Sequence, residues 1–124
     1  MSDDPYSARV RDYFARTAHA GDLEDAVIAE IAEQGVHLRL AATEYEGNIE
    51  ALRFRAWGCP HVIAACEYFC AEYEGKPVCA LGEFHASNIM RNLSVPVEKT
   101  GRILVLEDVV RLLERTIRDE SAPH

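Results

Sequence analysis

The residue types most able to do chemistry in this chain are its four cysteines and five histidines. Thiolate sulfur and imidazole nitrogen are both metal ligands, and the thiolate is also a nucleophile. Cys59 stands out because it lies between Gly58 and Pro60, where an alternating apolar pattern ends and a helical one begins. The free N–H groups and positive dipole of a helix start favour a thiolate at that position. His61 is close enough in sequence to be a second ligand or to hydrogen-bond the sulfur of Cys59. The alternative is that Cys59 is a residue of the helix start with no chemical role.

The other three cysteines are predicted to be packing residues. Cys66 and Cys70 lie one helical turn apart, and a rise of 1.5 Å per residue puts Cys66 roughly 10 Å along the helix axis from Cys59. Sulfur atoms on one tetrahedral metal lie about 4 Å apart, so Cys59 and Cys66 cannot bind the same ion. Cys66 and Cys70 are expected to pack in the core as buried apolar side chains, and the alternative is that the two pair with each other. Cys79 is also expected to pack as a small apolar side chain, and the absence of Cys-x-x-Cys spacing excludes a zinc ribbon.

The remaining motifs do not indicate an enzyme. His37 alternates with arginine on an outward strand face, His19 falls in a loop and His85 starts a short helix. The sequence contains no phosphate-binding glycine loop and no nucleophile elbow, and its carboxylates are spread over helix surfaces. We therefore expect a protein that does not catalyse a reaction by itself.

Length and composition set the class of molecule. The 124 residues suit one domain, and 48% hydrophobic with 27% charged residues is ordinary globular usage. A net charge of −8 argues against a nucleic-acid binder, because such proteins need clustered cations. No apolar run approaches a membrane span, and the start Met-Ser-Asp-Asp-Pro is no signal peptide. A cytoplasmic location without membrane contact is the expectation.

Hydrophobic periodicity and turn residues predict the elements that must position Cys59. The segment 23–34 is ambiguous, because its apolar spacing suits either a helix or a short strand. The other predicted elements are a helix capped by Asp4 and Pro5 and running to about Arg16, a hairpin from Val36 to Trp57 turning at Gly47-Asn48, a helix from Pro60 to about Glu74 ended by Gly75, short helical pieces near 78–83 and 86–93, an extended link at Val95-Pro96, and a last helix over about 102–119. This order indicates an α+β fold with an antiparallel sheet covered on one face.

Several segments, taken in order, resemble the NifU/IscU-type iron–sulfur cluster assembly scaffold family, in its N-terminal NifU-like domain. The similarity covers about residues 6–118. The matching segments are Tyr6 with Val10-Arg11-Asp12-Tyr13-Phe14, His19-Ala20-Gly21-Asp22-Leu23, Gly47 with Ile49-Glu50-Ala51-Leu52-Arg53-Phe54, the run from Trp57-Gly58-Cys59-Pro60-His61 to Ala65, Glu72 to Lys76, and Val95-Pro96-Val97-Glu98-Lys99.

The resemblance implies a single SufE/NifU-like domain over residues 1–124, with its core at about 5–119. It implies an α+β fold in which a three-stranded antiparallel meander carries an N-terminal helix and several C-terminal helices on one face. It also implies a strand over about Ala26–Glu33. Family members take sulfur from a cysteine desulfurase, hold a transient [2Fe–2S] cluster or iron, or zinc when isolated, and serve apoprotein acceptors.

The family builds its site from three cysteines with an aspartate and a histidine nearby. Of these three cysteine positions, only the middle one holds a cysteine in this chain, Cys59. The first ligand loop of the family falls on Ala32-Glu33-Gln34-Gly35, and its His-Cys falls on Thr100-Gly101. Completion of a site at Cys59 would therefore need His61, Glu33 or a second subunit. Two protomers of a homodimer would supply four ligands through Cys59 and His61. The alternatives are a metal-free interaction partner of a desulfurase and a persulfide carrier.

Overall fold

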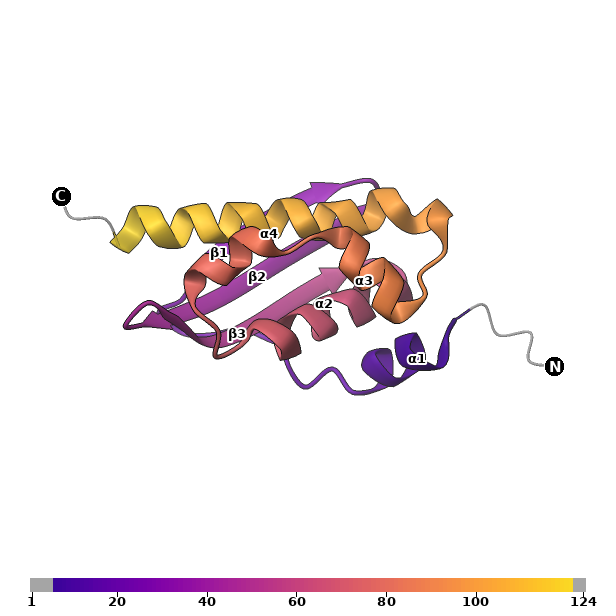
Figure 1. Ribbon diagram of the computed structural model, residues 1–124, viewed down its shortest axis with the longest axis horizontal. Helices are drawn as coiled ribbons and strands as arrows, with labels where there is room; N and C mark the ends of the chain where they lie inside the picture. Colours follow the sequence, from indigo (N-terminus) through magenta and orange to yellow (C-terminus); the bar gives the residue numbers. More distant parts are fainter. Residues whose placement is uncertain (1–5, 122–124) are drawn as a thin grey trace.

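A three-stranded antiparallel sheet carries the rest of the molecule. The computed structural model describes residues 6–121, and its strands β1 (Val27–Glu33), β2 (Val36–Tyr45) and β3 (Asn48–Trp57) follow the order β1-β2-β3 (Figure 1). The ambiguous segment 23–34 thus contains a strand and no helix, as the family resemblance implies. Its Val27, Ala29 and Ile31 face the core, opposite Ala42, Leu40 and Leu38 of β2.

Two-residue turns of one kind join the three strands. Gln34 and Gly35 have φ angles of 55° and 72°, and Glu46 and Gly47 have φ angles of 53° and 82°. Positive φ at both central residues is the type I′ geometry, which matches the twist of adjacent antiparallel strands. The predicted turn at Gly47-Asn48 is wrong by one residue, because Asn48 already pairs with Tyr45 in the ladder.

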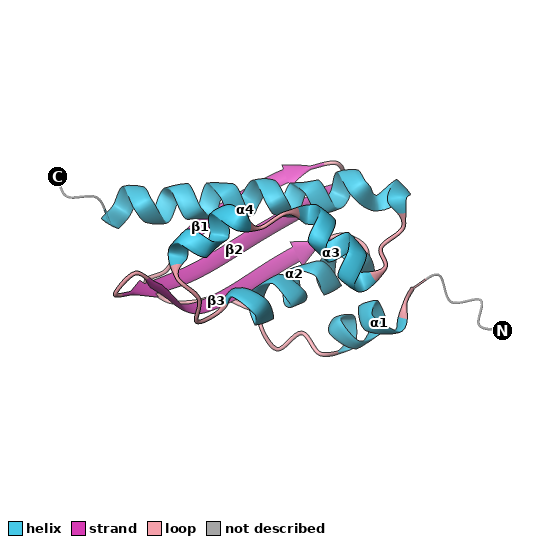
Figure 2. Ribbon diagram, viewed as in Figure 1, coloured by secondary structure: helices cyan, strands magenta, loops and turns pink. Residues whose placement is uncertain are grey.

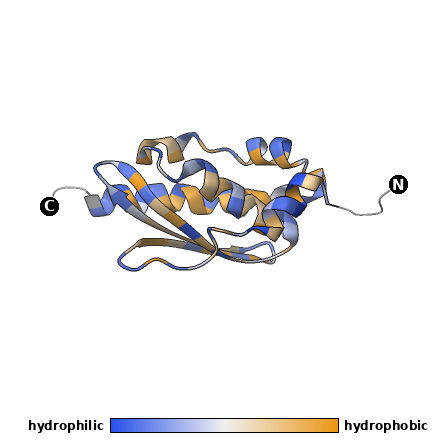
Figure 3. Cartoon of the chain, turned by 90° about the horizontal axis from the view of Figure 1, so that it is seen from below, coloured by the Kyte–Doolittle hydropathy of each residue, from blue (hydrophilic) through white to orange (hydrophobic). Residues whose placement is uncertain are grey.

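The helices cover one face of this sheet and leave the other face open (Figures 2 and 3). Helix α4 (Thr100–Ser121) packs on β1 and β2, and α2 (Pro60–Tyr73) packs on β3. Helix α1 (Ala8–Ala15) lies on α2, and α3 (Ala86–Leu93) lies against α4. The predicted α+β class and one-sided covering are therefore confirmed.

One hydrophobic core fills the space between the two layers. Alternate residues of β2 and β3, among them Leu38, Leu40 and Phe54, point toward the helices and are buried. From the helices, Phe69 and Leu106 enter the same cluster. Burial of such side chains contributes roughly 1.5–3 kcal/mol each, so this interface is the main source of stability.

The first helix begins later than the sequence predicts. Its N-cap is Ser7, whose hydroxyl accepts the N–H of Val10 at 3.1 Å and donates to the carbonyl of Leu93 at 2.6 Å. This double role satisfies a free N–H group and ties α1 to the end of α3. The predicted helix start at Asp4 and Pro5 falls on residues that lie outside the described range.

The C-terminal half follows the predicted order closely. Helix α2 ends at Tyr73, before Gly75, and the two short pieces are the 3₁₀ helix η1 (Val78–Glu83) and α3. A 3₁₀ turn η2 (Val97–Lys99) follows Pro96, and α4 starts at Thr100, two residues before the predicted position. None of the helices within residues 6–121 is long and apolar enough to cross a membrane.

Candidate functional site

Three segments that are distant in sequence meet at one end of the molecule, on the right of Figure 1. They are the β1–β2 turn at Gln34-Gly35, the junction of β3 and α2 at Gly58-Cys59, and the start of α4 at Thr100-Gly101. A Cβ placed on Gly58 would lie 3.7 Å from Cγ2 of Val36, and one on Gly101 would lie 3.8 Å from Oε1 of Gln34. We call this end of the molecule the tip.

Cys59 occupies the N-cap position of α2 at the tip. Its backbone is extended, with φ −80° and ψ 166°, and Pro60 follows as the first helical residue, as predicted. The Cys59 carbonyl accepts the N–H of Val62 at 3.0 Å and that of Ile63 at 3.2 Å, which closes the first turn. The thiol is half-buried and free. The junction of strand and helix therefore presents one thiol beside the helix start.

Opposing effects act on the ionisation of this thiol. Burial raises the pKa of Cys59, but hydrogen bonding from the backbone N–H of Val62, from the side chain of Arg102 and from the backbone of His61, together with the charge of Lys99, brings the pKa below the ordinary cysteine value. The thiolate is the nucleophilic and metal-binding form of cysteine. The site thus shifts the ionisation of Cys59 toward the thiolate, in the direction that the position at a helix start predicts.

His61 lies beside Cys59 and faces into the protein. Its Nδ1 is 4.0 Å from the Cys59 sulfur, and its ring centroid is 4.7 Å from that of Tyr6. The side chain is 2% exposed, and its Nε2 has no hydrogen-bond partner among residues 6–121. Burial, reinforced by Lys99 and Arg102 and opposed by Glu98, lowers the pKa of His61, so the ring is neutral at pH 7.

The third predicted ligand does not join this pair. Glu33 is exposed at the end of β1, and no group of three or more His, Cys, Asp or Glu side chains in the described part of the chain could hold a metal ion. The other tip positions are Gln34, Thr100 and Gly101, which supply no ligand of the thiolate or imidazole type. Among residues 6–121, the tip therefore brings together the sulfur of Cys59 and Nδ1 of His61, and no third ligand joins them.

The remaining cysteines take no part in the tip. Cys66 and Cys70 are buried in the core, as predicted, and burial raises the pKa of both thiols. The prediction that Cys79 packs as a small apolar side chain is wrong, since Cys79 is exposed. In η1 the inward positions are Val78 and Leu81, three residues apart, and the residue after Val78 points outward.

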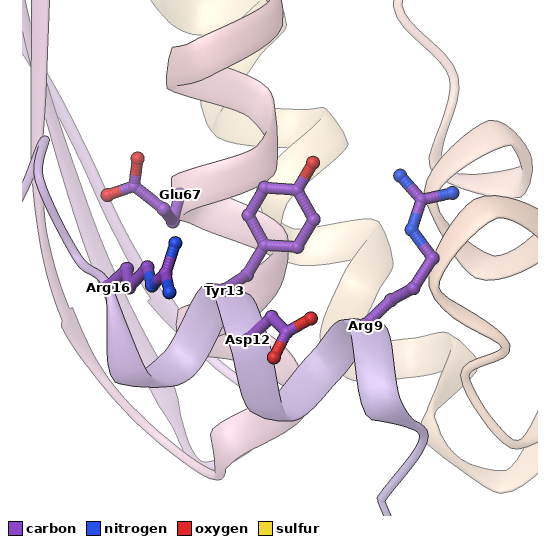
Figure 4. A pocket seen from close by; sticks show the side chains of 5 residues that line it. All are labelled: Arg9, Asp12, Tyr13, Arg16 and Glu67. Carbon is purple, nitrogen blue, oxygen red and sulfur yellow. The ribbon is translucent and has the colours of Figure 1, made fainter.

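A polar cluster joins the loop after α1 to α2, and no motif in the sequence indicates it. Glu67 is 3% exposed, and its carboxylate accepts the backbone N–H of His19 at 2.8 Å and pairs with Nδ1 of the same residue at 2.5 Å. Glu67 also lines a hollow of about 320 Å³ with side chains of α1 and the following loop, among them Tyr13 and Arg16 (Figure 4). The partners are 48 residues apart, and no local pattern indicates such a pair.

Two large apolar side chains are exposed at the tip. Trp57, two residues before Cys59, is 53% exposed, and Val97 of η2 is 82% exposed. The Trp57 ring packs against His37, 4.8 Å between centroids, and it lines two shallow hollows, one on each side of the strand end. An exposed tryptophan beside a reactive group can serve as an anchor for a partner macromolecule, because tryptophan is enriched among the residues that dominate interfaces.

Comparison with known proteins identifies the family. The family described as NifU-like N terminal domain matches residues 5–113. The chain is 22% identical over 123 residues to iron sulfur cluster assembly protein 1, mitochondrial, of Eremothecium gossypii, which covers 93% of this chain and 80% of that protein. It is 24% identical over 114 residues to the protein of the same name from Kluyveromyces lactis, covering 86% of this chain and 63% of that one.

Solved structures share the fold. A NifU-like N-terminal protein of Brucella abortus superimposes with a TM-score of 0.74 at 13% identity, covering 94% of this chain and 95% of that one. A protein of Fervidobacterium islandicum AW-1, proposed as an iron–sulfur cluster assembly scaffold for the SUF system, gives 0.59 at 20% identity, covering 90% and 85%. The match over residues 5–113 and these shared folds lead to one conclusion: the chain belongs to the NifU-like N-terminal domain family.

Proposed function

We propose that this protein acts in iron–sulfur cluster assembly as a scaffold-like protein that receives sulfur, iron or a transient [2Fe–2S] unit at Cys59. The observation that carries the proposal is the Cys59 thiol at the tip, half-buried at the start of α2 with a lowered pKa. Membership of the NifU-like family and the names of the relatives from Eremothecium and Kluyveromyces support it. The cluster is cargo here, and the protein's part is to hold and release it.

A sulfur-transfer step at Cys59 follows from the chemistry of the thiolate. Attack by the Cys59 thiolate on the terminal sulfur of a desulfurase persulfide forms a new S–S bond and breaks the old one. The desulfurase cysteine leaves as a thiolate, and Cys59 carries the sulfur as a persulfide. No external oxidant is needed, because the oxidised sulfur atom moves from one cysteine to the other. Arg102 and Lys99 would stabilise the anion before and after transfer.

The proposed partners are a cysteine desulfurase and the apoproteins that receive the cargo. Trp57 is exposed beside the site and lines hollows of about 230 and 380 Å³ that apolar side chains of a partner could fill. An exposed aromatic side chain that becomes buried when a partner binds often dominates the interface. We expect the desulfurase to contact Trp57 while its persulfide reaches Cys59.

A metal-free role is the second candidate, and one observation favours it. The described residues contain no three-ligand group, so residues 6–121 of one chain do not form an ordinary four-ligand site. In that case the protein would bind the desulfurase and regulate it, or carry persulfide, without holding iron.

Incubation with a desulfurase and cysteine, followed by intact-mass measurement, tests the proposal. We expect a gain of one sulfur in the native chain and in Cys79→Ser, and no gain in Cys59→Ser. Cys79 is the matched control, because it is a second accessible thiol whose loss should not matter. Anaerobic reconstitution with iron and sulfide should also give visible absorption that depends on Cys59.

Each result separates the candidates. A sulfur gain with no colour supports the persulfide carrier, and desulfurase binding that is indifferent to Cys59→Ser supports the metal-free partner. If the chain neither gains sulfur, nor becomes coloured, nor binds a desulfurase, the proposed function is wrong.

A further inference from the structure

We infer that His19 is a pH-sensitive latch: its protonated ring holds α1 and the loop after α1 against α2 and β3, and loss of a ring proton releases them. The latch consists of three side chains outside the tip, His19, Glu67 and Glu74. It is independent of the chemistry proposed for Cys59, and it adds a conformational control of the N-terminal part of the described chain.

The two ring nitrogens of His19 face two different carboxyl groups. Nδ1 lies 2.5 Å from Oε2 of Glu67, and Nε2 lies 3.4 Å from Oε1 of Glu74. An ionised carboxylate only accepts hydrogen bonds, so each ring nitrogen needs a hydrogen of its own. A ring with a hydrogen on both nitrogens is the cationic form of histidine. The geometry therefore favours a protonated His19.

The charges of the latch balance only in this form. Glu67 is 3% exposed, and among residues 6–121 its one ion-pair partner is His19. Glu74 pairs with Arg53 at 2.9 Å. Burial raises the pKa of Glu74, but hydrogen bonds from Leu52 and Arg53 bring it below the ordinary glutamate value, so Glu74 is ionised at neutral pH. A neutral His19 would leave the buried Glu67 without a counter-ion, which is costly.

The other charged and titratable groups near Glu67 do not replace His19. The hollow beside Glu67 is also lined by three charged side chains of α1 and its C-cap, Arg9, Asp12 and Arg16 (Figure 4). Within residues 6–121, neither arginine forms an ion pair with Glu67. The thiols of Cys66 and Cys70 stay uncharged, because burial raises the pKa of both.

Few apolar contacts hold the segment that the latch fastens. The buried residue of α1 is Val10, whereas Phe14 is 44% exposed. The loop is joined to the outer edge of β3 by two bonds: the N–H of Phe54 donates to the carbonyl of His19 at 2.9 Å, and the N–H of Gly21 donates to that of Phe54 at 2.9 Å. A segment with so little buried apolar surface opens readily when a polar anchor is lost.

The start of the same segment lies against the tip. Tyr6, two residues before α1, packs on His61 with 4.7 Å between the ring centroids. Release of α1 would therefore uncover His61, which lies beside Cys59. Because imidazole changes charge near neutral pH, a modest rise in pH is enough to alter the surroundings of the tip.

Two substitutions of His19 fix its charge in opposite states. The lysine of His19→Lys is a cation, and the glutamine of His19→Gln is neutral, on both sides of the histidine range. We expect the native chain to resemble His19→Lys at low pH and His19→Gln at high pH. His37→Gln is the matched control, because His37 also pairs with a carboxylate, Glu30, but lies outside the latch.

Limited trypsin digestion of the full chain at about pH 6 and about pH 9 measures the opening of α1 through cleavage after Arg16. We expect cleavage of the native chain to rise roughly tenfold more than that of His19→Lys between the two pH values, because proteolysis follows the population of the open form. Comparison with His19→Lys removes the pH dependence of trypsin itself. His19→Gln should be cleaved rapidly at both pH values, and His37→Gln should behave like the native chain.

Methyl NMR of the native chain is a second measurement, which needs no variant. The methyl signals of Val10, buried beneath α1, should shift between the two pH values, and those of Leu40 in the sheet should not. Constant Val10 signals, the native pH response in His19→Gln, or opening only together with unfolding of the sheet would each overturn the inference. None of these readouts depends on a sulfur gain at Cys59, so failure of the latch leaves the proposed function standing.

Discussion

Burial and charge act in opposite directions on the Cys59 thiol, and charge with hydrogen bonding prevails. Burial raises the pKa of Cys59, while N–H groups of α2 and the cations Arg102 and Lys99 lower it further than burial raises it. Arg102 is contributed by α4, over 40 positions along the chain from the thiol it affects. The helix start at Cys59 could be predicted from Gly58 and Pro60, but the Arg102 contact depends on the tertiary fold.

Replacement of Arg102 should make this thiol less reactive. We expect Arg102→Met to raise the pKa of Cys59 and to slow its alkylation at pH 7 by roughly 3- to 10-fold, since one pKa unit changes the thiolate fraction about tenfold. Alkylation by iodoacetamide, followed by peptide mass analysis as a function of pH, measures both quantities. Arg115→Met, an exposed change on the same helix, is the control. Equal rates in the two variants would show that Arg102 does not govern the thiol.

At the scale of elements, the local sequence determines most helix and strand boundaries, and tertiary contacts determine the others. The alternation of apolar and polar residues predicts β2 and β3, and Pro60 and Gly75 predict where α2 begins and ends. The cap of α1 at Ser7 depends partly on the hydrogen bond from the Ser7 hydroxyl to the carbonyl of Leu93, a tertiary contact that local sequence does not reveal. The exposure of Cys79 is not predicted from the sequence, because a 3₁₀ helix, not an α-helix, sets which side chains of η1 point inward.

The β2–β3 turn leaves room for stabilisation. Glu46 has a φ of 53° in a position where asparagine is strongly preferred, directly before Gly47. We expect Glu46→Asn to raise the free energy of unfolding by roughly 0.5 kcal/mol, measured by urea denaturation. Glu50→Asn, on the extended strand β3, should give no gain. A loss of stability in Glu46→Asn would contradict the type I′ assignment.

The buried carboxylate of Glu67 joins the N-terminal loop to α2. Glu67→Ala would leave the backbone N–H and ring of His19 without their acceptor, and we expect a loss of about 2–3 kcal/mol in the free energy of unfolding. Glu72→Ala, on an exposed position of the same helix, should cost less than about 0.5 kcal/mol. Similar losses in both variants would show that the cluster contributes no more than helix propensity.

At the scale of the whole molecule, Glu74 joins three parts of the fold. Its carboxylate accepts the N–H of Leu52 at 2.8 Å and a guanidinium N–H of Arg53 at 2.9 Å, and its other oxygen lies 3.4 Å from Nε2 of His19. Burial raises the pKa of Glu74, but these partners together bring it below the ordinary glutamate value.

Acid should therefore destabilise the molecule partly through Glu74. Because its pKa is lower in the folded state, its contribution is present above about pH 4.5 and is lost as pH falls through the folded value. We expect urea midpoints to fall less steeply between about pH 5 and 3 in Glu74→Gln than in the native chain. Glu72→Gln, an exposed change, should keep the native slope, and equal slopes in all three proteins would exclude this role.

The tip is made of the β1–β2 turn, the start of α2 and the start of α4, so no single stretch of chain contains it. The β1–β2 turn and the start of α4 come together only when the sheet has formed and α4 has packed on it. An incompletely folded chain has a thiol at residue 59 but lacks the cations of α4 beside it. Loading at Cys59, as proposed above, therefore requires the completed fold, because a chain that has not yet placed α4 keeps a thiol without these cations.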